Sequence, residues 1–162
     1  MRRIIIATSL VLQLAAPLAL ASDINCRVVA IVDGDTFKCL NASNEQVKVR
    51  MAEIDAPESK QPYGTRARQA LSEMVFGKEV SLQVRDTDRY GRTVARVFEG
   101  QVDVNAELVS KGAAWVYRQY SRDRQLLILE SEARVAGRGV WSLPEAERMP
   151  PWEWRRTFKK RG

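Results

Sequence analysis

Apolar and polar residues alternate in several short runs between residues 27 and 98. A period of two is typical of strands that bury one face. In residues 46–51, for example, Val49 and Met51 lie on one face and Arg50 lies on the opposite face. Turn-forming residues separate the runs. The pattern predicts five strands, at residues 27–32, 35–40, 46–51, 79–85 and 93–98.

Apolar residues follow helical spacing between residues 67 and 75, and Gly77 supplies a stop signal. Two further helices are predicted at residues 103–111 and 122–136, each followed by glycine. A low strand count, with helices available to cover the ends, favours a small closed barrel over a sandwich. The predicted fold class is therefore α+β, a five-stranded OB-fold barrel with about three helices.

The first 21 residues have the features of a signal peptide. Two arginines precede an uncharged run, and that run ends in Ala-Leu-Ala at residue 21. The pattern predicts cleavage before Ser22 and export to the periplasm or the extracellular medium. A membrane anchor is the alternative, since the run approaches spanning length.

Removal of residues 1–21 leaves a length that suits one domain. We assign residues 22–145 to that domain. Residues 146–162 form a C-terminal extension that contains Trp152 and Trp154 and ends in basic residues. We expect the tryptophans to dock on the domain and the basic end to attract phosphate weakly as a solvated tail.

Composition narrows the chemistry. The chain has 26 basic and 20 acidic residues, a net charge of +6 that suits a polyanionic partner. The absence of histidine excludes histidine-based triads and general bases, and it argues against a protein zinc site. The two cysteines, Cys26 and Cys39, lie on neighbouring predicted strands, so an exported chain is expected to join them in a disulfide. Two buried free thiols are the alternative.

Carboxylates stand at the ends of apolar strand-like runs, where burial of charge is costly. Asp35 and Asp55 supply hard oxygen donors of the kind that Ca²⁺ or Mg²⁺ prefers. Taken alone, Asp33-Gly34-Asp35 also fits a simple hairpin turn. Arg50 and Arg92 carry planar guanidinium groups that can pair with phosphate through two hydrogen bonds, and ordinary surface salt bridges are the alternative.

Three motifs occur in order along the chain: DGDT at 33–36, R-x4-D-x-P-E at 50–58, and DRYGR at 88–92. Together they resemble the staphylococcal nuclease family, also called thermonucleases, over about residues 25–142. Because three separate motifs match, the resemblance is specific. It implies a nuclease domain built on an OB-fold barrel.

The resemblance implies a metal site. Asp35 and Asp55 would be the carboxylate ligands of a catalytic Ca²⁺, the backbone carbonyl of Ala56 would be a further ligand, and Asp33 would support them. Ala56 stands where the family often has threonine, so a backbone ligand survives while any contribution from a hydroxyl is lost.

The resemblance also implies catalytic roles. Glu58 would act on the attacking water, as a general base or as the group that orients it. Arg50 and Arg92 would clamp the scissile phosphate, where negative charge develops during attack.

Four residues resemble nucleotide contacts of the family. Arg89 and Tyr90 would contact a nucleotide phosphate. Tyr117 and Tyr120 are candidates to pack against a base, since stacking on aromatic rings tolerates any sequence. Their spacing departs from the family's Tyr-x-Tyr, so a core or surface role is the alternative for either tyrosine.

The function implied by the resemblance is that of a secreted Ca²⁺-dependent endonuclease that hydrolyses DNA and RNA and leaves 3′-phosphate ends. We expect a monomer, with no stable protein partner and no membrane attachment after cleavage. The alternative is a non-catalytic OB-fold module that binds nucleic acid. The full set of acids and arginines favours the enzyme, because a binding module has no physical need for them.

Overall fold

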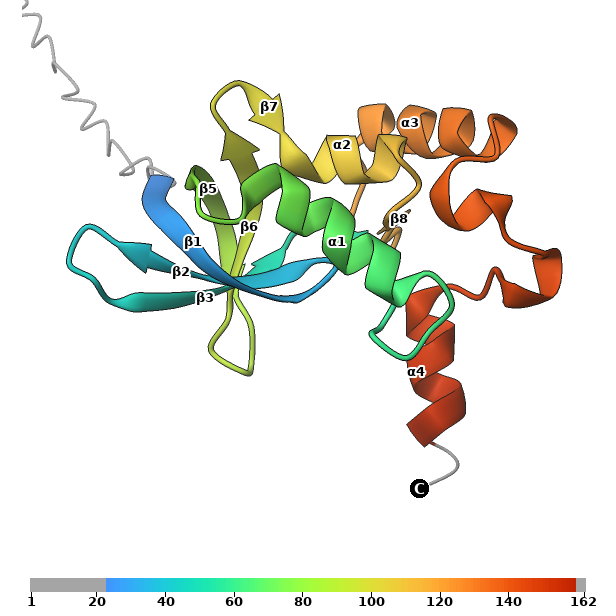
Figure 1. The fold of residues 1–162 in the computed structure, drawn as a ribbon, viewed down its shortest axis with the longest axis horizontal. Coiled ribbons are helices and arrows are strands. Elements are labelled where there is room, and N and C mark those ends of the chain that lie inside the picture. Colours follow the sequence, from blue (N-terminus) through green and yellow to red (C-terminus); the bar gives the residue numbers. More distant parts are fainter. Residues whose placement is uncertain (1–22, 160–162) are drawn as a thin grey trace, which may run out of the picture.

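Five strands form a closed barrel in the computed structural model, which describes residues 23–159 (Figure 1). The predicted signal peptide and its cleavage point before Ser22 lie outside these residues. The five barrel strands are β1 (Asp23–Asp33), β2 (Thr36–Asn41), β3 (Gln46–Met51), β5 (Glu79–Thr87) and β6 (Thr93–Glu99). Their order in the sheet is β3-β2-β1-β5-β6. A parallel pairing of β3 with β6 closes the barrel, as predicted for an OB-fold.

Three very short strands extend this framework. They are β4 (Ile54–Asp55), β7 (Val102–Asp103) and β8 (Trp115–Val116). β4 pairs with β8 in a separate two-stranded sheet, and β7 adds to β6. Two residues carry too little periodicity for a sequence pattern to identify a strand, which is why the sequence did not predict them.

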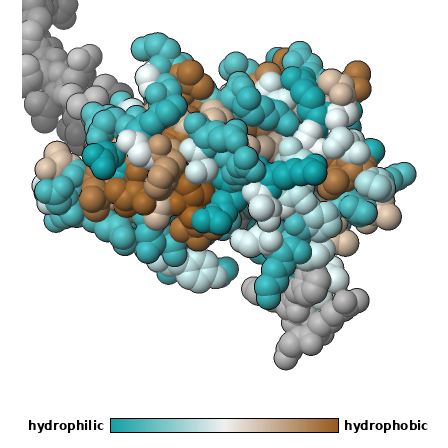
Figure 2. Space-filling model, in the orientation of Figure 1, coloured by the Kyte–Doolittle hydropathy of each residue, from teal (hydrophilic) through white to brown (hydrophobic). Residues whose placement is uncertain are grey.

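Three of the helices were predicted from the sequence: α1 (Gly64–Val75), α2 (Val104–Ser110) and α3 (Arg124–Val135). Two 3₁₀ turns follow, η1 (Gly139–Ser142) and η2 (Glu145–Glu147), and the described chain ends in α4 (Pro151–Lys159). No helix in residues 23–159 is long and apolar enough to cross a membrane. On the face seen in Figure 2, hydrophilic residues predominate, with smaller apolar areas between them.

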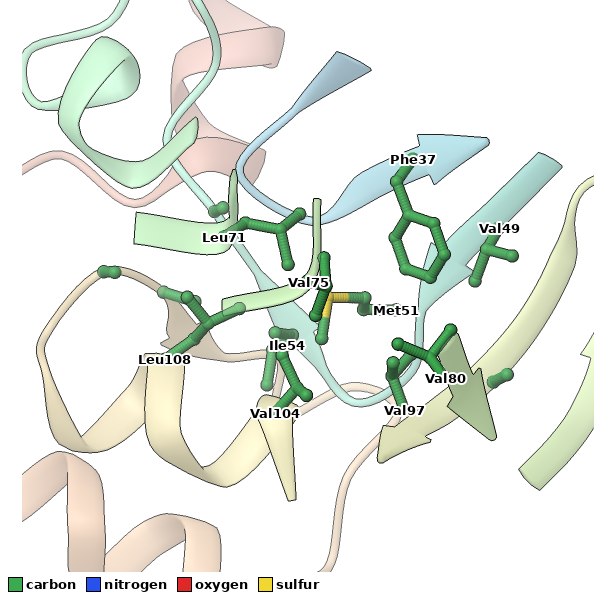
Figure 3. Packing of buried hydrophobic residues seen from close by; sticks show 14 of the residues in the cluster. Phe37, Val49, Met51, Ile54, Leu71, Val75, Val80, Val97, Val104 and Leu108 are labelled. Atoms are coloured by element: carbon green, nitrogen blue, oxygen red, sulfur yellow. The ribbon is translucent and has the colours of Figure 1, made fainter. Parts of the chain in front are cut away.

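The main core lies between the barrel and the first two helices (Figure 3). Barrel residues Phe37, Val49 and Met51 are fully buried in it. Leu71 from α1 and Leu108 from α2 close the same cluster. The alternation read in β3 is therefore confirmed, because Val49 and Met51 face this core while Arg50 leaves it.

The sequence predicted a docked pair of tryptophans followed by a solvated basic tail. The structure has a helix, α4, in this segment. Pro151, at its first position, suits a helix start because the missing N–H has no partner there in any helix. Nine residues are too few for stability from propensity alone, so tertiary packing must hold the helix. Trp152 supplies that packing, with its ring 6.1 Å from the ring of Trp115.

Buried polar side chains hold the segment that joins β3 to β4. Arg96 donates to Glu53 at 2.9 Å and to Asp103 at 2.6 Å. Asn105, which is fully buried, donates to the carbonyl of Ala52 at 2.8 Å. These contacts fix the backbone immediately before Asp55.

A disulfide joins Cys26 of β1 to Cys39 of β2, as predicted, with 5.5 Å between the Cα atoms. Both cysteines are buried in the main core. The bridge closes a short loop that includes the β1–β2 turn, so it constrains the unfolded chain in that region.

Replacement of both cysteines by alanine should lower the free energy of unfolding by about 2–4 kcal/mol, the usual range for a native disulfide. Urea denaturation of the two proteins measures the difference. As a control, reductant should lower the midpoint of the natural protein and leave that of the double variant unchanged. Equal stability of the two proteins would contradict the prediction.

Candidate active site

The ends of three neighbouring strands bring the predicted acids and Arg50 together. The β1–β2 turn carries Asp35, β3 carries Arg50, and β4 carries Asp55. The β2–β3 register pairs Thr36 with Arg50, which places Arg50 beside the turn. The amide of Met51 also donates to the carbonyl of Asp35 at 2.9 Å, so β3 continues along the turn.

One guanidinium nitrogen joins the two buried carboxylates. Nη2 of Arg50 lies 2.9 Å from Oδ1 of Asp55 and 3.2 Å from Oδ2 of Asp35. Nη1 of the same side chain donates to the carbonyls of Ile54, at 2.9 Å, and of Met51. Arg50 is therefore fixed by backbone as well as by charge, and it holds both acids in one small volume.

Asp35 has a full set of local partners. Its Oδ2 accepts from the amide of Ala56 at 2.7 Å, and its Oδ1 accepts from the hydroxyl of Thr36 at 3.0 Å. Its own amide donates to Oδ1 of Asp33 at 3.2 Å. Asp33 thus orients the turn through the backbone of Asp35.

Burial concentrates negative charge here. Desolvation, together with the charge of Asp35, raises the pKa of Asp33 to about 7. Desolvation also raises the pKa of Asp55, although hydrogen bonding to Arg155 and the charge of Arg50 oppose the change. Groups that resist ionisation in this way favour a nearby cation, because a cation stabilises the charged form.

Gly34 allows the turn to lie close to α1. A Cβ atom at this position would stand 2.7 Å from Cβ of Ala56 and 2.8 Å from Cβ of Ala67. The glycine is therefore required by a close approach, and the small side chains at 56 and 67 complete the fit. The β1–β2 turn is therefore a hairpin turn, and it also carries Asp35 of the candidate site.

Glu58 lies in the loop between β4 and α1 and reaches the same cluster through Arg155. Oε1 of Glu58 is 2.6 Å from Nη1 of Arg155, whose Nη2 is 2.7 Å from Oδ2 of Asp55. The amide of Glu58 donates to the side chain of Gln61 at 3.1 Å. Gln61 in turn donates to the carbonyl of Met149 at 2.5 Å. The loop that carries Glu58 is thus tied to the segment before α4.

The sequence analysis did not identify Arg155 or Gln61 as residues of this cluster. A pattern that could have drawn attention to α4 is the spacing of Trp152 and Arg155, which places both on one face of a helix. We interpreted the residues after Trp154 as a solvated tail because most of them are basic, and we therefore did not recognise the short amphipathic helix.

Arg92 lies immediately before β6, and the pairing of Thr93 with Val49 places this end of β6 beside β3. Its Nε donates to Oδ2 of Asp88 at 2.7 Å. Among the described residues, no hydrogen bond or ion pair joins it to Asp35, Asp55 or Glu58. The structure therefore places Arg92 beside the strand that carries Arg50, and its ion pair is with the nearby residue Asp88.

Arg89 and Tyr90 form an exposed group next to Arg92. The guanidinium carbon of Arg89 lies 5.1 Å from the centre of the Tyr90 ring, and that of Arg92 lies 5.6 Å from it. The ring of Tyr90 is largely exposed. Two cations against one exposed aromatic ring form a surface suited to a phosphate-bearing chain.

Tyr117 and Tyr120 contact each other edge to face, with ring centres 4.9 Å apart. Tyr117 also stacks in parallel on Trp152 of α4, with ring centres 5.3 Å apart. Tyr120 is exposed. In this structure Tyr117 is covered by an indole, and Tyr120 presents its ring to solvent.

Asp35 and Asp55 are oxygen donors of the kind that a hard divalent cation prefers, and both contact Nη2 of Arg50. Residues 23–159 contain no group of three or more histidine, cysteine, aspartate or glutamate side chains placed to hold a metal ion. A cation held by these two carboxylates would therefore take its other ligands from carbonyl and water oxygens, which Ca²⁺ accepts.

Comparison with known proteins agrees with this fold. The family model described as staphylococcal nuclease homologue matches residues 48–143, a range that includes Arg50, Asp55, Glu58 and Arg92. A protein of Haemophilus influenzae named "Uncharacterized endonuclease" is 42% identical over 158 residues, which cover 97% of this chain and 88% of that protein. A "Micrococcal nuclease" of Shigella flexneri is 41% identical over 165 residues, which cover 95% of this chain and 92% of its own length.

The barrel and these similarities define the class as a nuclease fold. The chain belongs to the staphylococcal nuclease family. The names of its relatives support nuclease activity, that is, hydrolysis of phosphodiesters.

Substitution of Gly34 by alanine should lower the free energy of unfolding by about 1–3 kcal/mol, because the added Cβ overpacks the contact with Ala56 and Ala67. It should also lower nuclease activity by moving Asp35 relative to Asp55. Urea denaturation and an activity assay measure the two effects. The double variant Gly34→Ala/Ala56→Gly removes one of the two close contacts and should recover part of the stability. Unchanged stability in Gly34→Ala would show that the turn has room to spare.

Proposed function

We propose that this chain is an exported, Ca²⁺-dependent endonuclease that hydrolyses phosphodiester bonds of DNA and RNA and leaves 3′-phosphate ends. The observation that carries the proposal is the burial of Asp35 and Asp55 on a single guanidinium nitrogen of Arg50, with Glu58 next to them. Burial of two acids at this place is costly, and a cation-dependent reaction of phosphate supplies a reason for it.

Asp35, Asp55 and the backbone carbonyl of Ala56 are the residues proposed to hold the cation. Bound there, Ca²⁺ would supply charge neutralisation for the phosphate and a lower pKa for a water molecule. Asp33 keeps Asp35 in place by accepting its amide N–H. The substitution of Ala56 for the threonine common in the family leaves this carbonyl available.

Arg50 and Arg92 are proposed to hold the scissile phosphate. Guanidinium groups can donate two parallel hydrogen bonds to its oxygens, and this pairing strengthens as negative charge develops during attack. Arg50 would have to turn Nη2 from Asp35 and Asp55 to phosphate while the backbone carbonyls keep Nη1 in place. Arg92 would have to exchange Asp88 for phosphate, and their pair lies near the surface, where such exchange costs little.

Glu58 is proposed to act on the attacking water, as the base that takes its proton or as the group that orients it. Formation of the new bond from water oxygen to phosphorus would accompany cleavage of the bond to the 5′-oxygen, which takes up a proton from solvent and leaves as a hydroxyl. The phosphate then stays on the 3′-oxygen, consistent with the proposed products.

Arg89, Tyr90 and Tyr120 are proposed to contact the nucleotides on either side of the cleaved bond. All three are exposed, and base stacking with phosphate pairing requires no particular sequence. Tyr117 can join them only where Trp152 does not cover its ring. These contacts suit single strands of DNA or RNA.

Export is proposed from the signal-like residues 1–21 and is consistent with the disulfide between Cys26 and Cys39. The oxidising compartment could be the periplasm or the medium. We propose that the exported chain acts as a monomer.

The first test is a nuclease assay on the exported protein, whose intact mass shows whether the chain begins at Ser22. We expect cleavage of single-stranded DNA and RNA in Ca²⁺ and loss of cleavage in excess chelator, with recovery when Ca²⁺ is restored. End-group analysis should find 3′-phosphates. Equal activity in chelator would remove the cation from the proposal, and binding without cleavage under every condition would favour the non-catalytic module.

Arg92→Lys and Glu58→Gln should each lower turnover by roughly 10²-fold or more, while the affinity for an oligonucleotide with non-cleavable linkages changes far less. Lysine keeps the charge and loses the second hydrogen bond, and glutamine keeps the shape and cannot take a proton. Arg85→Lys, an exposed arginine on β5, is the matched control and should cut at the natural rate. Natural rates in both site variants at saturating Ca²⁺ would end the catalytic assignment.

A further inference from the structure

Arg155 of α4 places a second guanidinium group, besides that of Arg50, among the acids of the site. Its Nη2 is 2.7 Å from Oδ2 of Asp55, and its Nη1 is 3.1 Å from Oδ1 of the same carboxylate. Nη1 is also 2.6 Å from Oε1 of Glu58. Both oxygens of Asp55 are therefore engaged by one side chain that comes from the end of the chain.

The contact is built by the fold around it. Trp152 lies on the same face of α4 as Arg155, and it packs on Trp115 and Tyr117. The hydrogen bond from Gln61 to Met149 fastens the start of this segment to the loop of Glu58. Figure 1 shows α4 below the loop that leads into α1. α4 is thus anchored beside the loop, and Arg155 projects from the anchored helix into the carboxylates.

The hydrogen bonds of Arg155 to Asp55 and Glu58 stabilise its charged form. Burial alone would lower the pKa of Arg155, but its bonds to Asp55 and Glu58 raise the pKa above the ordinary value. The side chain remains 39% exposed, whereas that of Asp55 is 1% exposed. The guanidinium group therefore meets solvent on one side, so water is available to it when it leaves the carboxylates.

A cation held by Asp35 and Asp55 has to share Asp55 with this group. Two positive charges at one carboxylate repel each other, and the repulsion is large because the carboxylate is buried. Arg50 contacts the same acids, but its second nitrogen is held by backbone carbonyls, so it belongs to the framework. Arg155 comes from α4, and the hydrogen bonds of its side chain go to the carboxylates of Asp55 and Glu58.

We propose that Arg155 is a further residue of the active site, which competes with the divalent cation for Asp55 and thereby sets the cation concentration at which the site fills. In the absence of the cation, Arg155 offsets the negative charge of Asp55 and Glu58. When the cation binds, Arg155 gives up Asp55 while α4 stays anchored through Trp152 and Gln61. The inference rests on the proposed cation site.

The test is calorimetric titration of the full exported chain with Ca²⁺, without nucleic acid. Arg155→Gln should bind Ca²⁺ about tenfold or more tightly than the natural protein. Arg156→Gln, which removes the same charge from the exposed neighbouring position, is the matched control and should bind as the natural protein does. Circular dichroism of each variant confirms that the fold is intact.

A second variant reaches the same contact by another route. Trp152→Ala removes the packing that positions α4, so it should also tighten Ca²⁺ binding, by less than Arg155→Gln. The same affinity in the natural protein and Arg155→Gln, or weaker binding in Arg155→Gln, would overturn the competition and leave the proposed function standing. No Ca²⁺ binding by any of these proteins would instead overturn the proposed cation site, and the competition with it.

Discussion

The bridge from Arg50 to Asp35 and Asp55 is the interaction on which the rest of the site depends. Two carboxylates with almost no exposed surface repel each other and lose their hydration, so they can share a small volume only beside a positive charge. Arg50 supplies that charge, and the carbonyls of Met51 and Ile54 hold its other nitrogen. The site is thus assembled before any ligand arrives.

The barrel provides the geometry for this bridge. Closure through the pairing of β3 with β6 fixes the strand that carries Arg50 on both of its edges. The β1–β2 turn can then approach α1 closely because Gly34 has no side chain. Polar contacts from Arg96 and Asn105 hold the segment before Asp55 from the other side. Each carboxylate therefore sits on backbone that is constrained independently of the other.

The C-terminal helix makes the site different from an open cleft. Arg155 closes the acids from the solvent side, and Trp152 lies over Tyr117, which the sequence had suggested as a base-stacking residue. A nuclease that is exported benefits from such an arrangement if activity depends on the cation, because the acids stay neutralised until the cation is abundant. In the proposed competition, Arg155 and the cation would bind the same oxygens of Asp55, so the cation concentration would decide which of them holds the carboxylate.

Much of the fold could be predicted because it depends on local pattern. Alternation gives the barrel strands, helical spacing gives α1, α2 and α3, and the spacing of Cys26 and Cys39 on adjacent strands gives the disulfide. The acids of the DGDT turn and the arginine of β3 could also be identified. They are charged residues close together along the chain, at the ends of or within apolar strand-like runs, where burial of a charge is costly. The order of three motifs added the family.

The sequence alone determined the barrel and the family, favoured the disulfide that the structure contains, and indicated that Asp35, Arg50 and Asp55 lie close together. Only the tertiary structure decided that Arg155 joins Asp55, a contact between residues 100 positions apart in the chain. It likewise decided that Tyr117 is covered by Trp152, that Gly34 is needed for a close approach, and that Arg92 pairs with Asp88. The physical reason is that such contacts follow from the packing of elements distant in sequence. A short helix that is held by one docked indole also has too little local sequence pattern to be predicted.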